Sequence, residues 1–166
     1  MDFGLLILRA AAGLVMAAHG AQKLFGWFGG YGLAGTAGYF EQLGFRPGRT
    51  FAAAAAIAEF AGGLLITAGF LGPIGPAAVL ATMIVAAGSV HWPKGLFAQN
   101  GGYELALIYA VVAVGLALTG PGAYSIDAAT GLASLWTPTV VALALAAGVI
   151  GGVANLVARR PAPVGA

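Results

Sequence analysis

Long apolar stretches dominate the chain, and they restrict it to folds in which helices cross a lipid bilayer. A membrane-spanning helix needs about 20 mostly apolar residues, and five stretches approach that length. They run over residues 3–25, 51–71, 74–92, 102–119 and 136–157. Glycines and prolines typical of turns separate several of them, as between Gly72 and Pro76. The sequence therefore predicts an all-α, polytopic bundle of transmembrane helices.

The composition agrees with that class and excludes others. The 166-residue chain is 60% hydrophobic and 7% charged, whereas an ordinary globular domain carries roughly 25% charged residues. Its 28 glycines suit close contact between membrane helices. Seven basic residues are too few for a nucleic-acid surface. Because the chain has no cysteine, a disulfide framework and a thiolate metal site are excluded.

The placement of basic residues predicts the orientation. With five spans, one side of the membrane holds Lys23, Arg46, Arg49, Lys94, Arg159 and Arg160. With four spans, the last two arginines would lie on the other side and weaken this bias. Basic residues concentrate on the cytoplasmic side of membrane proteins. We therefore expect a multi-pass protein of the cell (inner) membrane with its C-terminus in the cytoplasm.

The connection after the first stretch is long and rich in glycine and aromatic residues. Its central part, residues 33–43, is compatible with a short helix, and its aromatic rings suit the headgroup region. Two interpretations stay open: an interfacial lid without a ligand, or a flap over a pocket.

Ionisable side chains inside the apolar stretches are the candidate functional residues. On a helix, Arg9, His19 and Lys23 fall on one face of the first stretch. Glu59 lies near the middle of the second, where an unpaired carboxylate costs roughly 2.5–3.5 kcal/mol on insertion scales. We expect Arg9 and Glu59 to form a structural ion pair, in a network that includes His19.

The ends of the next two stretches carry His91 and Glu104. If the helices bundle, these residues meet the first group in the cytoplasmic half of the membrane. Catalytic candidates are His19, Glu59 and His91, and ligand-binding candidates are Arg9, Lys23, Glu104, Gln22 and Tyr103. Structural roles stay open as well: Lys23 can extend to the headgroups, and Glu104 suits the first turn of a helix.

Several chemistries could use such a pocket. A quinone headgroup needs hydrogen-bond donors at its two carbonyl oxygens and proton exchange there, which His, Lys, Arg and Glu can provide. His19 and His91 could instead ligate a haem from two helices, although haem is the less favoured reading because two histidines are the minimum. A proton-coupled carrier of a small solute is a further alternative. No metal site and no nucleotide motif is expected.

Several motifs together resemble the DoxX family of small integral membrane proteins. They are Leu8-Arg9, Gly13 and His19-Gly20-Ala21-Gln22-Lys23-Leu24-Phe25-Gly26, then Gly32 to Thr36, Ala58 to Gly63, His91, Gly95 to Phe97, Gly101 to Glu104 and Gly120 to Asp127. The resemblance covers about residues 3–127. It implies a core of four helices and transfers the family's polar positions to Arg9, His19, Lys23, Glu59, His91 and Glu104.

The resemblance divides the chain into a DoxX-like bundle (1–127), a linker with a fifth span (128–160) and a short cytoplasmic tail (161–166). It implies a membrane subunit of an oxidoreductase system, linked to quinone or oxidative stress and not catalytic alone. Expected partners are the bilayer, a small redox-active lipid and redox-enzyme subunits. A non-catalytic scaffold for cytoplasmic redox enzymes is the other alternative. Gly148 and Gly152 form a GxxxG motif that suggests a homo-oligomer.

Overall fold

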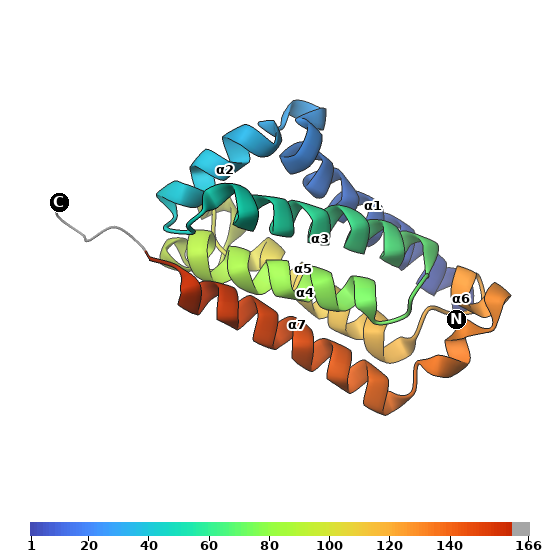
Figure 1. Cartoon of the computed structure of the whole chain (residues 1–166). Coiled ribbons are helices and arrows are strands. Elements are labelled where there is room, and N and C mark those ends of the chain that lie inside the picture. Colours follow the sequence, from blue (N-terminus) through green and yellow to red (C-terminus); the bar gives the residue numbers. More distant parts are fainter. Residues whose placement is uncertain (161–166) are drawn as a thin grey trace.

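The computed structural model describes residues 1–160, and every regular element within them is helical (Figure 1). The main helices are α1 (Asp2–Phe25), α2 (Gly32–Gln42), α3 (Gly48–Ala68), α4 (Ile74–Ala86), α5 (Glu104–Thr119), α6 (Ile126–Thr130) and α7 (Pro138–Ala158). Short helical turns are η1 (Trp27–Gly29), the π-helical η2 (Ala87–His91), η3 (Trp92–Lys94), η4 (Ala98–Asn100) and η5 (Leu132–Leu135). The predicted all-α class is confirmed, and the short cytoplasmic tail predicted for residues 161–166 lies outside the described residues.

Membrane-spanning length is reached by α1, α3, α7 and the continuous helical stretch Ile74–Lys94, which joins α4 to η2 and η3. All four are apolar enough to cross a bilayer. Helix α5 is apolar but has only 16 residues, about 24 Å at 1.5 Å per residue. Multi-pass membrane architecture is therefore shown, and it includes the C-terminal helix predicted beyond the four-helix core.

Glycines set the contact between α1 and α3, which run antiparallel. A Cβ atom added at Gly20 would lie 2.3 Å from the backbone nitrogen of Phe60, and one at Gly63 would lie 2.4 Å from that of Ala17. Only glycine permits so close an approach of two helices. This packing fixes the register, so that the C-terminal end of α1 lies beside the middle of α3.

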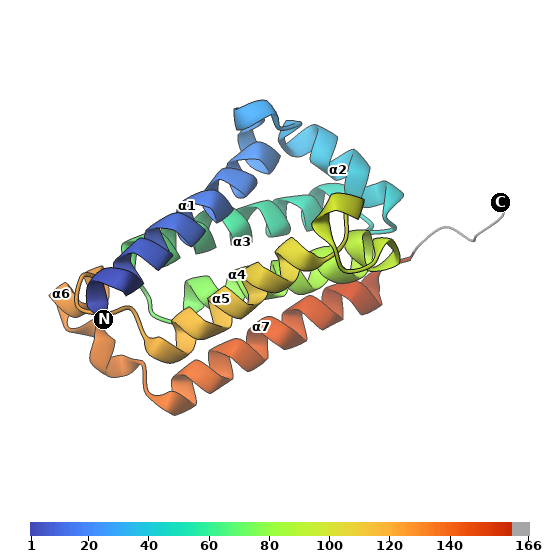
Figure 2. The same cartoon turned by 180° about the vertical axis from the view of Figure 1, so that it is seen from behind.

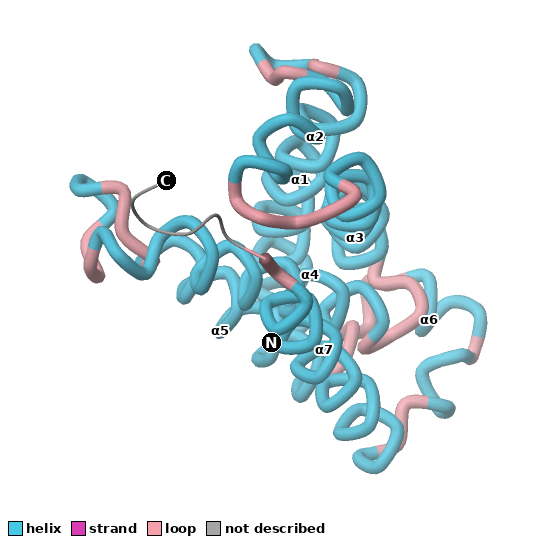
Figure 3. The backbone as a smooth tube through the Cα atoms, turned by 60° about the vertical axis from the view of Figure 1, so that its left-hand side comes forward, coloured by secondary structure: helices cyan, strands magenta, loops and turns pink. Residues whose placement is uncertain are grey.

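Helix α4 lies between α3 and α7 and packs against both (Figures 1 and 3). The GxxxG motif of α7 makes its contact with α4: Cβ atoms at Gly148 and Gly152 would lie 2.6 Å from the carbonyl oxygen of Ala77 and 2.9 Å from that of Ala81. This contact gives the motif a role within the chain, and the homo-oligomer stays a prediction. The motif is already occupied by a helix of the same chain.

The two ends of the bundle differ. Helix α6 and the start of α1 lie at one end, and α2 and the end of α7 lie at the other (Figures 1 and 2). At the second end, the Arg159 side chain donates to the carbonyl oxygen of Leu43 (2.5 Å), and the Arg160 amide donates to that of Gly44 (2.8 Å). The last turn of α7 is thereby tied to the segment that joins α2 to α3.

The central part of the first connection is α2, as the sequence predicted. It packs along the N-terminal half of α3 and also contacts α1. Phe40 and Phe45, with their ring centroids 5.4 Å apart, are buried there against Ala52 of α3. Hydrophobic burial therefore holds α2 over α3.

Candidate functional site

A cavity of about 910 Å³ lies at the α2 end of the bundle, with walls from α1, α2, α3, α4 and α7. Its volume falls within the roughly 300–1,000 Å³ of small-molecule sites. Much of the lining is apolar, from side chains such as Phe51, Ala55 and Val85. Its polar lining residues are Gln22, Lys23, Tyr31, Thr36, Tyr39, Gln42, Glu59, Thr82, Ser89, His91 and Asn155.

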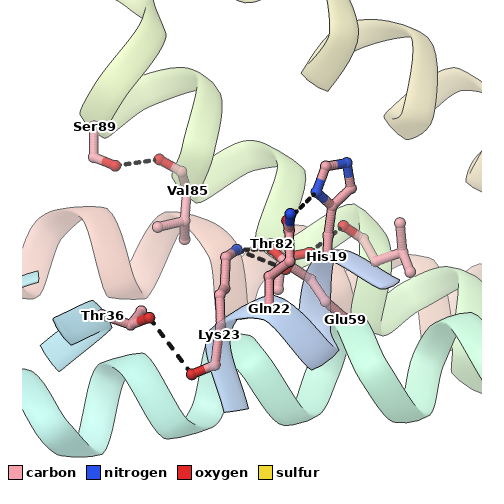
Figure 4. A network of polar contacts seen from close by, with 9 residues as sticks. His19, Gln22, Lys23, Thr36, Glu59, Thr82, Val85 and Ser89 are labelled. Atoms are coloured by element: carbon pink, nitrogen blue, oxygen red, sulfur yellow. Dashed lines mark hydrogen bonds and ion pairs between the residues drawn. The ribbon is translucent and has the colours of Figure 1, made fainter. Parts of the chain in front are cut away.

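An ion pair forms one wall of this cavity. The Nζ atom of Lys23 lies 2.5 Å from Oε1 and 2.6 Å from Oε2 of Glu59 (Figure 4). The Glu59 side chain is only 3% exposed, whereas that of Lys23 is 31% exposed. The carboxylate is thus satisfied by an amine that reaches it from the neighbouring helix. One hydrogen on Nζ remains, because an ammonium group carries three.

The register of α1 on α3 explains this pairing and corrects the predicted one. Arg9 does not pair with Glu59, so the predicted structural ion pair is wrong. The Arg9 guanidinium lies against Gly69, because a Cβ atom added there would overlap it. Gly69 follows Glu59 by ten residues, so Arg9 lies about 15 Å from Glu59 along α3. Counting depth from the sequence alone placed Glu59 between Arg9 and His19, whereas glycine packing places it beside Lys23.

Helix α4 and its π-helical continuation form the opposite wall, with Thr82, Ser89 and His91. A π turn takes more residues than an α turn, so it shifts the following side chains around the helix axis. Ser89 and His91 both lie in this segment. The Nδ1 atom of His91 donates to the carbonyl oxygen of Gly101 at 2.6 Å. That bond fixes the ring from the η4–α5 loop.

Helix α7 adds Gly151 and Asn155 to the lining. The Asn155 amide nitrogen donates to the carbonyl oxygen of Gly151 at 2.8 Å. Asn155 was not among the residues predicted to bind a ligand. An amide near the end of an apolar, Ala-rich stretch was the available signal, since such a group needs a polar partner within the membrane.

Several predicted site residues lie outside the cavity lining. His19 is exposed and contacts the Gln22 side chain at 3.3 Å. Glu104 accepts a hydrogen bond from the Ala98 amide at 2.8 Å, and Tyr103 stacks on Trp92 with ring centroids 5.1 Å apart. Glu104 and Tyr103 therefore order the η4–α5 loop. His19 and His91 do not share the cavity.

Arg9 belongs to a second polar cluster, toward the opposite end of the bundle. It is 2% exposed and donates to the carbonyl oxygen of Tyr124 at 2.5 Å. Asp127, which is fully buried, attracts it electrostatically. Asp127 also accepts hydrogen bonds from the amides of Leu71 (3.0 Å) and Gly72 (2.7 Å) and from the Trp136 indole (2.7 Å).

This second cluster joins α1, the α3–α4 turn and the segment before α7. It explains why a buried arginine is tolerated without Glu59, because the opposite charge is supplied from α6. Sequence reasoning missed the role of Asp127, which follows the turn Gly120-Pro121-Gly122 and lies outside every apolar stretch. The available signal in the sequence was that Asp127 is the one acidic residue between Thr119 and Trp136, a tryptophan whose indole N–H needs an acceptor.

Helices of spanning length around a cavity with a charged wall define a polytopic membrane protein with a candidate ligand site. The DoxX family model matches residues 4–92, which is more than half of the chain and includes Lys23, Glu59 and His91. The chain therefore belongs to the DoxX family. The match ends at Trp92, the first residue of η3, so the resemblance seen between Gly95 and Asp127 lies beyond it. Comparisons with curated proteins and with solved structures gave no match.

Proposed function

We propose that the protein is a membrane subunit of an oxidoreductase system and that its cavity binds a quinone-type, redox-active lipid. The observation that carries the proposal is the Lys23–Glu59 ion pair in the wall of a largely apolar cavity of about 910 Å³. A headgroup with polar atoms on an apolar ring fits such a lining, because apolar surface supplies affinity and a few polar groups fix the orientation.

The membrane location supports a lipid as ligand. The cavity walls are helices of spanning length together with α2 and the residue before it, and the aromatic side chains of Tyr31 and Tyr39 are exposed there. Aromatic rings of this kind favour the headgroup region. A ligand with an apolar tail could then reach the cavity from the bilayer. We propose that this end of the bundle faces the cytoplasm, since Lys94, Arg159 and the other basic loop residues gather there.

Electron transfer would require partner subunits. A chain without cysteine has no thiol redox centre of its own. Lys23 and Glu59 would position the headgroup, and His91 would exchange protons with it, because an imidazole ring can both donate and accept a proton. We also propose that redox-enzyme subunits are its partners and that the protein has a role in oxidative stress.

The test is quantification of lipids that co-purify with the protein in mild detergent. We expect one quinone-type lipid at close to one molecule per chain in the native protein. Ala58 lines the cavity, whereas Ala61, on the same helix, is exposed and does not. Ala58→Phe should therefore remove the lipid and Ala61→Phe should keep it.

Three outcomes would contradict the proposal in different ways. Equal lipid content in both variants would show that the lipid binds outside the cavity. A haem absorbance band in the purified protein would replace the quinone with another cofactor. If uptake of a solute into vesicles followed a pH gradient and no quinone co-purified, a proton-coupled carrier would be the better account.

A further inference from the structure

The hydrogen-bonding groups in the α4–α7 wall of the cavity have nearly all of their donors engaged. The single hydroxyl hydrogen of Thr82 is donated to the carbonyl oxygen of Val79 at 2.8 Å, and that of Ser89 to the carbonyl oxygen of Val85 at 2.6 Å. A hydroxyl group that donates its only hydrogen keeps two acceptor lone pairs. Both hydroxyl oxygens therefore keep acceptor lone pairs, and both residues line the cavity; Figure 4 shows the two side chains.

His91 is fixed in the same sense. A carbonyl oxygen can only accept, so the 2.6 Å contact with Gly101 requires the hydrogen of the neutral ring to be on Nδ1. The Nε2 atom of the neutral ring is then an acceptor. The tautomer is thus determined by a backbone group outside the cavity.

Asn155 completes this wall. Its amide nitrogen donates to the Gly151 carbonyl oxygen at 2.8 Å. Its amide oxygen makes no hydrogen bond with any residue between 1 and 160. Thr82, Ser89, His91 and Asn155 thus offer four acceptors from one side of the cavity, against one free donor, the second N–H of the Asn155 amide.

The opposite wall adds two free donors and no net charge. Lys23 directs two contacts at Glu59, which leaves one N–H. The Gln22 amide group donates one hydrogen to the Phe28 carbonyl oxygen at 3.1 Å and keeps its second N–H. Tyr31, Tyr39 and Gln42 line the cavity from exposed positions at its rim, where water satisfies them. The paired charges of Lys23 and Glu59 cancel, so this ion pair gives a cation no advantage over a neutral ligand.

We infer that the cavity selects the reduced, hydroquinone form of its ligand over the quinone. A hydroquinone has two O–H donors, whereas a quinone has two carbonyl acceptors and no donor. An acceptor placed opposite acceptors makes no hydrogen bond with them, whereas a hydroquinone O–H gains one, and this difference in free energy favours the reduced form. One hydroquinone O–H faces the α4–α7 wall, and the Lys23 N–H meets an oxygen at the other end of the ring.

This inference rests on the proposed function and makes Asn155 a residue that determines specificity. Helix α7 lies beyond the segment that matches the DoxX family model. Redox-form selectivity in this chain thus depends on a helix outside the matched core. A ligand that binds more tightly when reduced is also harder to oxidise while bound, so the site holds hydroquinone until a partner accepts its electrons.

The test compares two probes under anaerobic conditions by equilibrium dialysis against the full-length protein in detergent. The probes are a 1,4-naphthohydroquinone with a short alkyl tail and the corresponding 1,4-naphthoquinone. Binding to Ala58→Phe measures partition into micelles and is subtracted. We expect the hydroquinone to bind at least ten-fold more tightly. Equal or tighter quinone binding overturns the inference and leaves the proposed function intact, whereas no specific binding of either probe defeats both.

Two substitutions locate the selectivity. Asn155→Leu should weaken hydroquinone binding about five-fold, as expected for one neutral hydrogen bond, and weaken quinone binding by a smaller factor. Ser89→Ala, a smaller change, should act in the same direction. Ala154, an exposed neighbour of Asn155 outside the cavity lining, supplies the control Ala154→Leu. If Asn155→Leu weakened both probes by the same factor, the assigned acceptor role would be wrong.

Discussion

Removing either member of the Lys23–Glu59 pair should have unequal consequences for stability. The two side chains form one ion pair but differ in burial: the Lys23 side chain is 31% exposed and the Glu59 side chain is 3% exposed. Lys23→Met leaves a carboxylate without its partner in a buried position, which costs about 3–5 kcal/mol in other proteins. Glu59→Met leaves an ammonium that can turn toward water along its flexible stem, so the loss should be about 1 kcal/mol, as for a partly exposed pair.

The double variant Lys23→Met/Glu59→Met provides the control. Replacing a buried pair with apolar side chains of similar volume is often neutral or stabilising. The double variant should therefore be more stable than Lys23→Met alone. Unfolding can be followed by the fluorescence of the three tryptophans as the mole fraction of sodium dodecyl sulfate rises. Equal losses in the two single variants, or an additive loss in the double variant, would refute the argument from burial.

Three further outcomes follow from the helix contacts. Gly148→Ala places a methyl group 2.6 Å from the carbonyl oxygen of Ala77 and should destabilise the protein by about 1–3 kcal/mol. In the control Gly151→Ala, the added methyl group meets nothing within 4 Å, so this variant should be neutral or slightly stabilising. The reverse order of stability in a denaturation series would disprove the α4–α7 contact. Asp127→Asn replaces the counter-charge of Arg9 and one acceptor oxygen, so it should cost about 2 kcal/mol or more in the same series; a loss no larger than that of Trp136→Phe would show that the charge contributes nothing. A green fluorescent protein fused to the C-terminus should fluoresce, because the basic end of α7 is proposed to face the cytoplasm; a dark but membrane-inserted fusion would reverse the orientation.

The helices could be predicted from the sequence because spanning length and apolar composition are local properties. Every predicted stretch contains a helix, and most ends agree within a few residues. The stretch 102–119 is α5, which begins at Glu104. The helix expected within residues 33–43 is α2. The interruption of α4 by a π segment could not be predicted, since nothing in the sequence from Ala87 to His91 specifies which hydrogen-bond pattern forms.

The partners of the charged residues were harder to predict, because they depend on the register between helices. Lys23, Glu59 and His91 were singled out from the sequence, and all three line the cavity. The pairing of Glu59 with Arg9 was wrong, because Gly20 and Gly63 set α1 against α3 at a different height. Depth estimated from the rise per residue along each separate helix does not include the shift between two helices that such close contacts produce.

Two residues were missed for opposite reasons. Asp127 lies in a segment without an apolar pattern, so the search inside the spans passed over it, and only the fold brings it beside Arg9 and Trp136. Asn155 lies inside a predicted span but is uncharged and, unlike Gln22, does not adjoin an ionisable residue, so the search for candidates passed over it. In a membrane protein, an amide within a span therefore needs the same attention as a charge.

Photoaffinity labelling tests most directly whether the cavity is the ligand site. A short-tailed azidoquinone would be photolysed with the purified protein, reduced or oxidised, and the labelled peptides would be mapped by mass spectrometry. The account predicts that the probe labels cavity residues of α3, α4 and α7. The reduced probe should label them more than the oxidised probe does, and neither probe should label these residues in Ala58→Phe. Labels confined to the exposed apolar face of α5, where Leu105, Ile108 and Val111 lie outside the cavity, would contradict it.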